Sequence, residues 1–118
     1  MQHNFKKLII WKESLELVIE TYKMTNKFPN EEKFGLTSQL NRCSVSIPSN
    51  IAEGTSKSSS KHFKTFLETS LGSAFEWETQ IIIAFKIGYI SQEKFKEVEN
   101  RINKIQNMIY NFMNKLEA

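Results

Sequence analysis

The side chains with the richest chemistry lie in the segment 42–53. Ser46, Asn50 and Glu53 are spaced i, i+4 and i+7, so a helix would project them from one face. Arg42 precedes them, and Glu76 further along the chain is a plausible partner for Arg42 or Asn50. Buried polar groups need hydrogen-bond partners, so this set favours a structural polar network that fixes helix register. A ligand-binding site, a subunit interface and a catalytic site are the alternatives.

The remaining reactive residues give little support for catalysis or metal binding. His3 and His62 are far apart in the sequence, and neither is close to Cys43. Glu76 and Glu78 are two residues apart, so on a helix their side chains diverge by about 200° and do not share a proton. No nucleotide-binding loop and no paired-cysteine motif occurs in the sequence. We therefore expect no catalytic residue, no metal and no cofactor, and we expect Cys43 to be a small buried residue.

Two groups of lysines are candidate phosphate-binding patches. One group lies near the N-terminus and the other surrounds a serine-rich loop: Lys6, Lys7 and Lys12, and Lys57, Lys61 and Lys64. Amines and the free amides of a helix start could bind the phosphates of a nucleic acid. The net charge of +3, from 16 basic and 13 acidic residues, permits nucleic-acid binding without requiring it. The alternative is that each group is simply a solvated surface.

Length and composition place the chain among globular proteins. Its 118 residues correspond to about one domain, which we place at 1–118. With two prolines and four glycines, the chain lacks the turn residues that an all-β fold needs. The single cysteine excludes an intramolecular disulfide and points to a reducing compartment. No apolar stretch approaches the ~18 residues of a membrane span, and the run at 8–11 is too short for a signal-peptide core. We expect a cytoplasmic protein with no membrane association.

The apolar periodicity predicts an all-α fold of four helices. The expected helices cover residues 10–27, 35–53, 60–87 and 92–116. Phe28-Pro29 ends the first, Gly54 ends the second and Gly88 ends the third, while Ser59 or Ser60 and Ser91 are candidate N-caps. Short connections favour an antiparallel up-down four-helix bundle.

The core face of each helix follows from the same periodicity. In the first two helices it consists of Trp11, Leu15, Val18, Ile19 and Tyr22, and of Leu36, Leu40, Cys43, Ile47 and Ile51. The second stripe continues through Pro48, so we predict one helix that is kinked there. A proline inside a helix costs roughly 3 kcal/mol, and tertiary packing or a binding role must offset that cost.

The third and fourth helices carry longer apolar stripes. The main stripe of the third is Phe63, Leu67, Ser70, Ala74, Trp77, Ile81, Ala84 and Gly88, with Leu71, Phe75, Ile82 and Phe85 beside it. The fourth has Phe95, Val98, Ile102, Ile105, Ile109, Phe112 and Leu116. Two stripes on one helix predict neighbours on more than one side. The small residues 72–74 favour close approach of another helix, and nine phenylalanines indicate a thick core, an oligomer interface, or both.

Several segments together resemble one bacterial family. The most specific is SIPSNIAEG at 46–54, preceded by GLTSQL at 35–40 and by Arg42. Further similar segments are FKKL at 5–8 with Trp11-Lys12, LGSA at 71–74 with Glu76 and ETQ at 78–80, and GYI at 88–90. In this order they resemble the four-helix-bundle family that is encoded by intervening sequences of large-subunit ribosomal RNA genes. The similarity covers nearly the whole chain.

This resemblance implies an up-down bundle that assembles into a ring-like homopentamer. The family has no established enzyme activity, and a related branch serves diversity-generating retroelements by binding nucleic acid and a reverse transcriptase. The resemblance thus implies a non-enzymatic scaffold whose partners are other copies of itself and structured RNA or a nucleic-acid-processing protein. The alternative is a structural protein–protein interaction module that binds no nucleic acid. Cys43 and Ser44 stand where the family often has a basic residue and alanine, which weakens a basic stripe on this helix.

Overall fold

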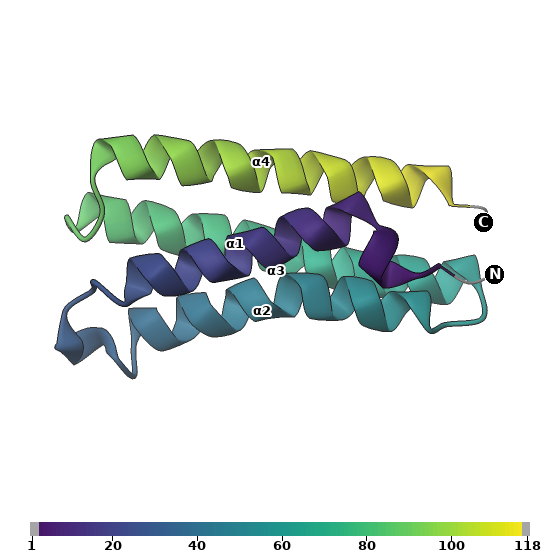
Figure 1. The fold of residues 1–118 in the computed structure, drawn as a ribbon, viewed down its shortest axis with the longest axis horizontal. Helices are drawn as coiled ribbons and strands as arrows, with labels where there is room; N and C mark the ends of the chain where they lie inside the picture. The colour runs from purple at the N-terminus through teal and green to yellow at the C-terminus, as the bar shows by residue number, and fades with distance from the viewer. Residues whose placement is uncertain (1–2, 117–118) are drawn as a thin grey trace.

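The computed structural model describes residues 3–116, which form four α-helices and two short 3-10 helices without a β-strand. The elements are η1 (Phe5–Lys7), α1 (Ile9–Thr25), η2 (Asn30–Glu32), α2 (Leu36–Thr55), α3 (Ser60–Lys86) and α4 (Gln92–Lys115). Figure 1 shows the four long helices side by side and alternating in direction, so the predicted up-down bundle is confirmed. α1 packs against α2 and α4, and α3 packs against the same two helices. Every helix boundary lies within two residues of the predicted one.

Three helices bury the apolar stripes that the sequence predicts. On α2 the fully buried side chains include Leu40, Ile47 and Ile51, while Leu36 packs against the core from its edge. On α3 and α4 the buried apolar side chains are Phe63, Leu67, Ala74, Trp77, Ile81 and Ala84, and Val98, Ile102, Ile105 and Ile109. The second stripe of α3 is only partly buried, and Phe75 is 54% exposed. Of the small residues 72–74, Gly72 faces open space, whereas Ser73 contacts α2 and the Ala74 carbonyl accepts from Gln106 of α4.

The predicted core face of α1 is wrong for most of its residues, although Trp11 packs against the edge of the core. Leu15, Ile19 and Tyr22 are 37%, 46% and 48% exposed, whereas α1 buries Ile10, Ser14, Leu17, Thr21, Met24 and Thr25. Three of these are hydroxyl residues whose side chains donate to carbonyls of their own helix: Ser14 to Ile10 and Thr21 to Leu17, both at 2.6 Å, and Thr25 to Tyr22 at 3.4 Å. Because these hydrogen bonds satisfy the hydroxyls, polar residues occupy core positions and hide the true stripe.

α2 continues without interruption through Pro48, so the predicted single helix is present and a kink is not confirmed. Pro48 is buried and lines a groove between α1 and α2, next to the stripe of Ile47 and Ile51, which have no exposed surface. The Ser70 hydroxyl of α3 donates to the Ile47 carbonyl at 2.8 Å, which ties this stretch to its neighbour. Tertiary packing of this stretch against α3 and the core therefore offsets the helix-breaking cost of the proline.

The helix ends follow the predicted signals except at Gly54. Ser59 and Ser91 accept hydrogen bonds from the amides of residues 62 and 94, as N-caps do. Gly88 has φ of +89° and ends α3. Gly54 lies inside α2, where an added Cβ would be 2.7 Å from the Phe63 ring. Glycine is therefore needed there for the close approach of α2 to α3.

Candidate nucleic-acid interface

The fold brings the two predicted lysine groups to the same end of the bundle. Figure 1 shows both chain ends and the α2–α3 loop together there. The His3 ring contacts the rings of Phe63 and Phe112, with centroids 5.3 and 5.7 Å away, so the N-terminal segment lies against the start of α3 and the end of α4. η1 packs against α1 and α2. Two patches that are separate in the sequence thus become one surface.

We call this surface the basic end and define it as residues 3–12, 52–64 and 112–116. Its charged side chains are one glutamate, Glu53, and seven lysines: Lys6, Lys7, Lys12, Lys57, Lys61, Lys64 and Lys115. All seven lysines are exposed or half-buried. Within residues 3–116 the ion pairs are Lys94 with Glu20 and Glu97, and Lys104 with Glu13, so these seven ammonium groups are not neutralised internally. No signal in the sequence marks Lys115 as part of this surface, because only the folded topology brings it there.

The opposite end of the bundle mixes charges of both signs. The Lys94 ammonium donates to the Glu20 carboxylate at 2.9 Å, and this hydrogen bond raises the pKa of Lys94. Glu32 accepts from the Leu36 amide at 2.9 Å and from the Tyr89 hydroxyl at 2.8 Å, so its pKa is lowered. The net charge of +3 therefore conceals an uneven distribution, because the basic end has seven lysines against one glutamate, whereas lysines and glutamates are interspersed at the opposite end.

The predicted polar band of α2 lies against α3. The Asn50 amide donates to the Ser46 carbonyl at 2.8 Å and to the Ser46 hydroxyl at 3.0 Å, and this hydroxyl is 2.9 Å from that of Ser73. Arg42 and Glu76 form no ion pair or hydrogen bond with each other within residues 3–116. The structure thus joins Ser46 and Asn50, while Arg42 and Glu53 remain exposed to solvent.

A polar groove of about 530 Å³ separates the exposed edges of α2 and α3. It is lined by Phe34, Ser38, Gln39, Arg42, Cys43, Ser46, Ser73 and Glu76. The Cys43 thiol donates to the Ser73 carbonyl at 3.0 Å. Burial and the neighbouring Glu76 carboxylate raise the pKa of Cys43 to about 12, so the thiol stays protonated near neutral pH. The groove therefore does not contain an activated nucleophile at this cysteine.

An apolar face covers the outer side of α1 and α2. Its central groove, about 370 Å³, is lined by Trp11, Leu15, Val18, Val45, Pro48, Ser49 and Ala52. Ile19 and Tyr22, which are exposed, extend this face along α1. The α1 residues of this face are the ones that the sequence pattern predicted to face the protein core. Contiguous exposed apolar surface of this kind is typical of protein–protein contacts.

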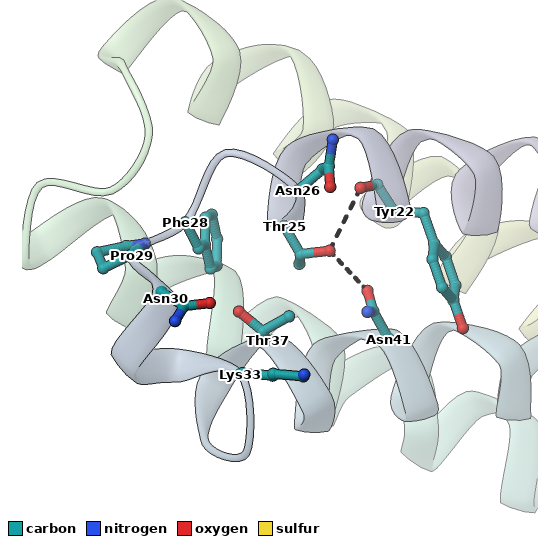
Figure 2. Close-up of a pocket in the computed structure, with 9 residues that line it drawn as sticks. All are labelled: Tyr22, Thr25, Asn26, Phe28, Pro29, Asn30, Lys33, Thr37 and Asn41. Carbon is teal, nitrogen blue, oxygen red and sulfur yellow. Dashed lines mark hydrogen bonds between the residues drawn. The ribbon is translucent and has the colours of Figure 1, made fainter.

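A smaller pocket of about 210 Å³ lies where α1 ends and α2 begins (Figure 2). Its lining is Tyr22, Thr25, Asn26, Phe28, Pro29, Asn30, Lys33, Thr37 and Asn41. The Thr25 hydroxyl lies 2.8 Å from the side-chain oxygen of Asn41 and 3.4 Å from the Tyr22 carbonyl. The pocket holds amides and hydroxyls with one ammonium group, which is a hydrogen-bonding lining without an acid–base pair.

Residues 3–116 contain neither a cluster of metal ligands nor a helix suited to crossing a membrane. No group of three or more histidine, cysteine or acidic side chains within residues 3–116 could hold a metal ion. In the same part of the chain, no helix has the length and apolar character that spanning a bilayer requires. Glu76 and Glu78 have separate partners, since Gln80 donates to Glu76 at 3.4 Å and Gln106 to Glu78 at 2.9 Å.

Comparison with known proteins identifies the family. The sequence profile of the 23S rRNA-intervening sequence protein family matches residues 6–111. The chain belongs to this family. No match was found among curated proteins. The matched region of this family member includes all four α-helices apart from the last residues of α4, and it contains every lysine of the basic end except Lys115.

A solved structure shares the fold of this 23S rRNA-intervening sequence protein. It is a crystal structure of a protein with unknown function from the S23 ribosomal protein family of Bacteroides thetaiotaomicron. The two superpose with a TM-score of 0.84 at 24% sequence identity, over 91% of this chain and 96% of the other. At this identity the likeness establishes the common fold alone.

Proposed function

We propose that this protein is a non-enzymatic, homo-oligomeric bundle that binds structured RNA through its basic end. The observation that carries the proposal is the meeting of seven lysines, none with an ion pair within residues 3–116, on one end of the molecule. Lysine ammonium groups bind phosphate, and a group of them supplies the salt-dependent affinity typical of nucleic-acid binding. Catalysis finds little support, because the glutamates have separate partners and the Cys43 thiol has a pKa of about 12.

Self-association is supported by the apolar face on α1 and α2. Its proposed occupant is a second copy of this chain, in agreement with the homopentamer that the family resemblance implies. Leu15, Ile19 and Tyr22 each expose more than a third of their surface, although helix positions facing solvent are usually polar. Contact between copies would bury these side chains and bring several basic ends together. Such multivalency raises the avidity for a long RNA above the affinity of one copy.

Binding of a folded RNA at increasing salt concentration tests the RNA-binding part of the proposal. We expect Lys57→Gln with Lys61→Gln to weaken binding by roughly tenfold near 0.1 M salt, because two ammonium groups no longer meet phosphates. The matched control is Lys23→Gln with Lys27→Gln, which removes the same charge from the opposite end of the bundle and should change affinity little. An intact oligomer that binds no RNA at low salt contradicts this part of the proposal.

Light scattering tests the oligomer. Ile19→Glu places a charge on the apolar face and should reduce the mass to that of a smaller species, with helical circular dichroism unchanged. Tyr110→Glu is the matched control, because Tyr110 is 57% exposed but lies on α4, away from this face. A wild-type protein that is monomeric at micromolar concentration contradicts self-association.

The polar band favours a second candidate, a protein-interaction module without nucleic-acid binding. Arg42 and Glu76 line the polar groove without an ion pair between them, and Glu53 is exposed at its end of α2. A subunit contact would give these charges partners. Glu53→Ala or Asn50→Ala should then dissociate the oligomer, while substitution of the basic-end lysines changes nothing. An unchanged mass for both variants rejects this candidate.

A further inference from the structure

Most aromatic rings around the basic end already contact other side chains. Phe5 lies edge-on to Trp11 with ring centroids 5.2 Å apart, and the Lys57 ammonium lies 4.8 Å from the centroid of the Phe66 ring. The His3 ring packs against two phenylalanines. Proteins that bind single strands usually stack successive bases on free aromatic faces. A platform of that kind would require these rings to leave their present partners.

Two exposed rings remain, one within the basic end and one close to it, and they come from different helices. His62 lies in the first turn of α3, and Tyr110 lies on α4 about 7.5 Å of helix length before Lys115. Neither has an aromatic contact to the other or to a third ring among residues 3–116. Two isolated rings do not provide the continuous stacking surface that a single strand uses.

The cations of the basic end suit phosphates and not base edges. All seven are lysines, whereas Arg42 and Arg101 lie outside the basic end, on the middle turns of α2 and α4. A lysine ammonium is a point charge on a flexible stem, while the planar guanidinium of arginine can make paired hydrogen bonds to a base or phosphate. Point charges respond to phosphate density and carry little sequence information.

The size of the basic end favours a duplex, whose phosphates are more densely spaced than those of a single strand. The molecule measures 45 × 24 × 20 Å, so the end of the bundle is 24 × 20 Å across. A duplex carries one charge per about 1.7 Å of its axis and a single strand about half as many, so the length of duplex that crosses this end carries more than ten phosphates, about twice as many as a single strand. Resting on the proposed RNA binding, we infer that the basic end binds the phosphate backbone of a double-stranded RNA stem and reads no base sequence.

The test compares three probes at one salt concentration. They are a stem of about 16 base pairs, the same stem with its sequence scrambled, and an unstructured single strand with the same number of phosphates. We expect both stems to bind equally within about twofold and at least about tenfold more tightly than the single strand. Equal or tighter binding of the single strand, or a clear preference for one stem sequence, overturns the inference. Failure to bind any probe instead rejects the proposed RNA binding itself.

Two sets of variants locate the binding surface. Replacing each basic-end lysine by glutamine should reduce the slope of log affinity against log salt by about 1 for every phosphate that the lysine neutralised. His62→Ala with Tyr110→Ala should leave the affinity for the stem unchanged, since stacking plays no part. A decrease of about tenfold or more in this ring variant, with the lysine variants unaffected, would show base stacking and overturn the inference. A DNA stem should bind with similar affinity, because a strong preference for RNA would require interactions beyond phosphate.

Discussion

Substitution of glycine by alanine should have opposite effects on stability at the glycines of α2 and α3. Gly54 lies near the end of α2, where a Cβ would be 2.7 Å from Cδ1 of Phe63 and 3.0 Å from Cβ of Phe66. Gly72 lies in the middle of α3, is exposed, and would give a Cβ no neighbour within 4 Å. We expect Gly54→Ala to destabilise the protein and Gly72→Ala to stabilise it.

The magnitudes follow from two opposing effects. Alanine is favoured over glycine inside a helix by about 1 kcal/mol, and Gly72→Ala should gain most of this. At Gly54 the same gain is smaller, because the helix ends at the next residue. Overpacking there costs about 1–3 kcal/mol, since both close atoms belong to α3 and the backbone-proximal Cβ of Phe66 cannot move away alone. The net destabilisation at Gly54 should be about 1–2 kcal/mol.

Urea unfolding followed by circular dichroism measures both effects. The variants and the parent must be compared at one protein concentration, because the proposed self-association would contribute to apparent stability. At the thermal midpoint, 1 kcal/mol corresponds to a shift of about 4 °C for a domain of this size. A Gly54→Ala protein as stable as the parent would show that α2 and α3 are not in close contact at the basic end. A destabilised Gly72→Ala protein would show that this position is covered in the assembly.

Three further predictions follow from single interactions. Thr21→Val should lower the free energy of unfolding by about 1–3 kcal/mol in urea, because the buried Trp77 indole N–H loses the Thr21 oxygen that lies 3.1 Å away. The native Cys43 thiol should react with iodoacetamide at pH 8 far more slowly than the unfolded protein does, since its pKa is raised to about 12; equal rates would contradict the buried position. The pKa of Glu32 is lowered, first by the hydrogen bond from the Leu36 amide and then by that from the Tyr89 hydroxyl. The ionised side chain therefore stabilises the folded protein above the usual pKa of 4.5, and this stabilisation is lost as the pH falls through the pKa of the folded state. Glu32→Gln should therefore flatten the dependence of the urea midpoint on pH below about 4.5, and an unchanged profile would contradict this assignment.

Helix boundaries could be predicted from the sequence, but the orientation of α1 could not. The apolar periodicity locates all four helices, and Gly88, Ser59 and Ser91 mark helix ends because they are specific terminal signals. On α1 the apolar stripe and the buried stripe are different faces. Hydrophobicity alone cannot distinguish a side chain that packs inside one chain from one that packs against another molecule. The buried hydroxyls of Ser14 and Thr21 add to the error, since their hydrogen bonds to the carbonyls of Ile10 and Leu17 become visible only in the structure.

The basic end could be predicted only in parts, because antiparallel connectivity creates it. Lys6 and Lys57 are separated by both α1 and α2, and they meet because α2 returns the chain to its starting end. Lys115 joins them because α4 returns the chain in the same way.

Because the lysines gather at one end of the bundle, the symmetry of an assembly would decide where its basic ends lie. Rotation about a cyclic axis preserves the component of each bundle axis along it, so a ring in which the bundles run along the symmetry axis would gather every basic end on one rim. A dihedral assembly would divide them between two rims, and the number of RNA stems bound per particle distinguishes these arrangements.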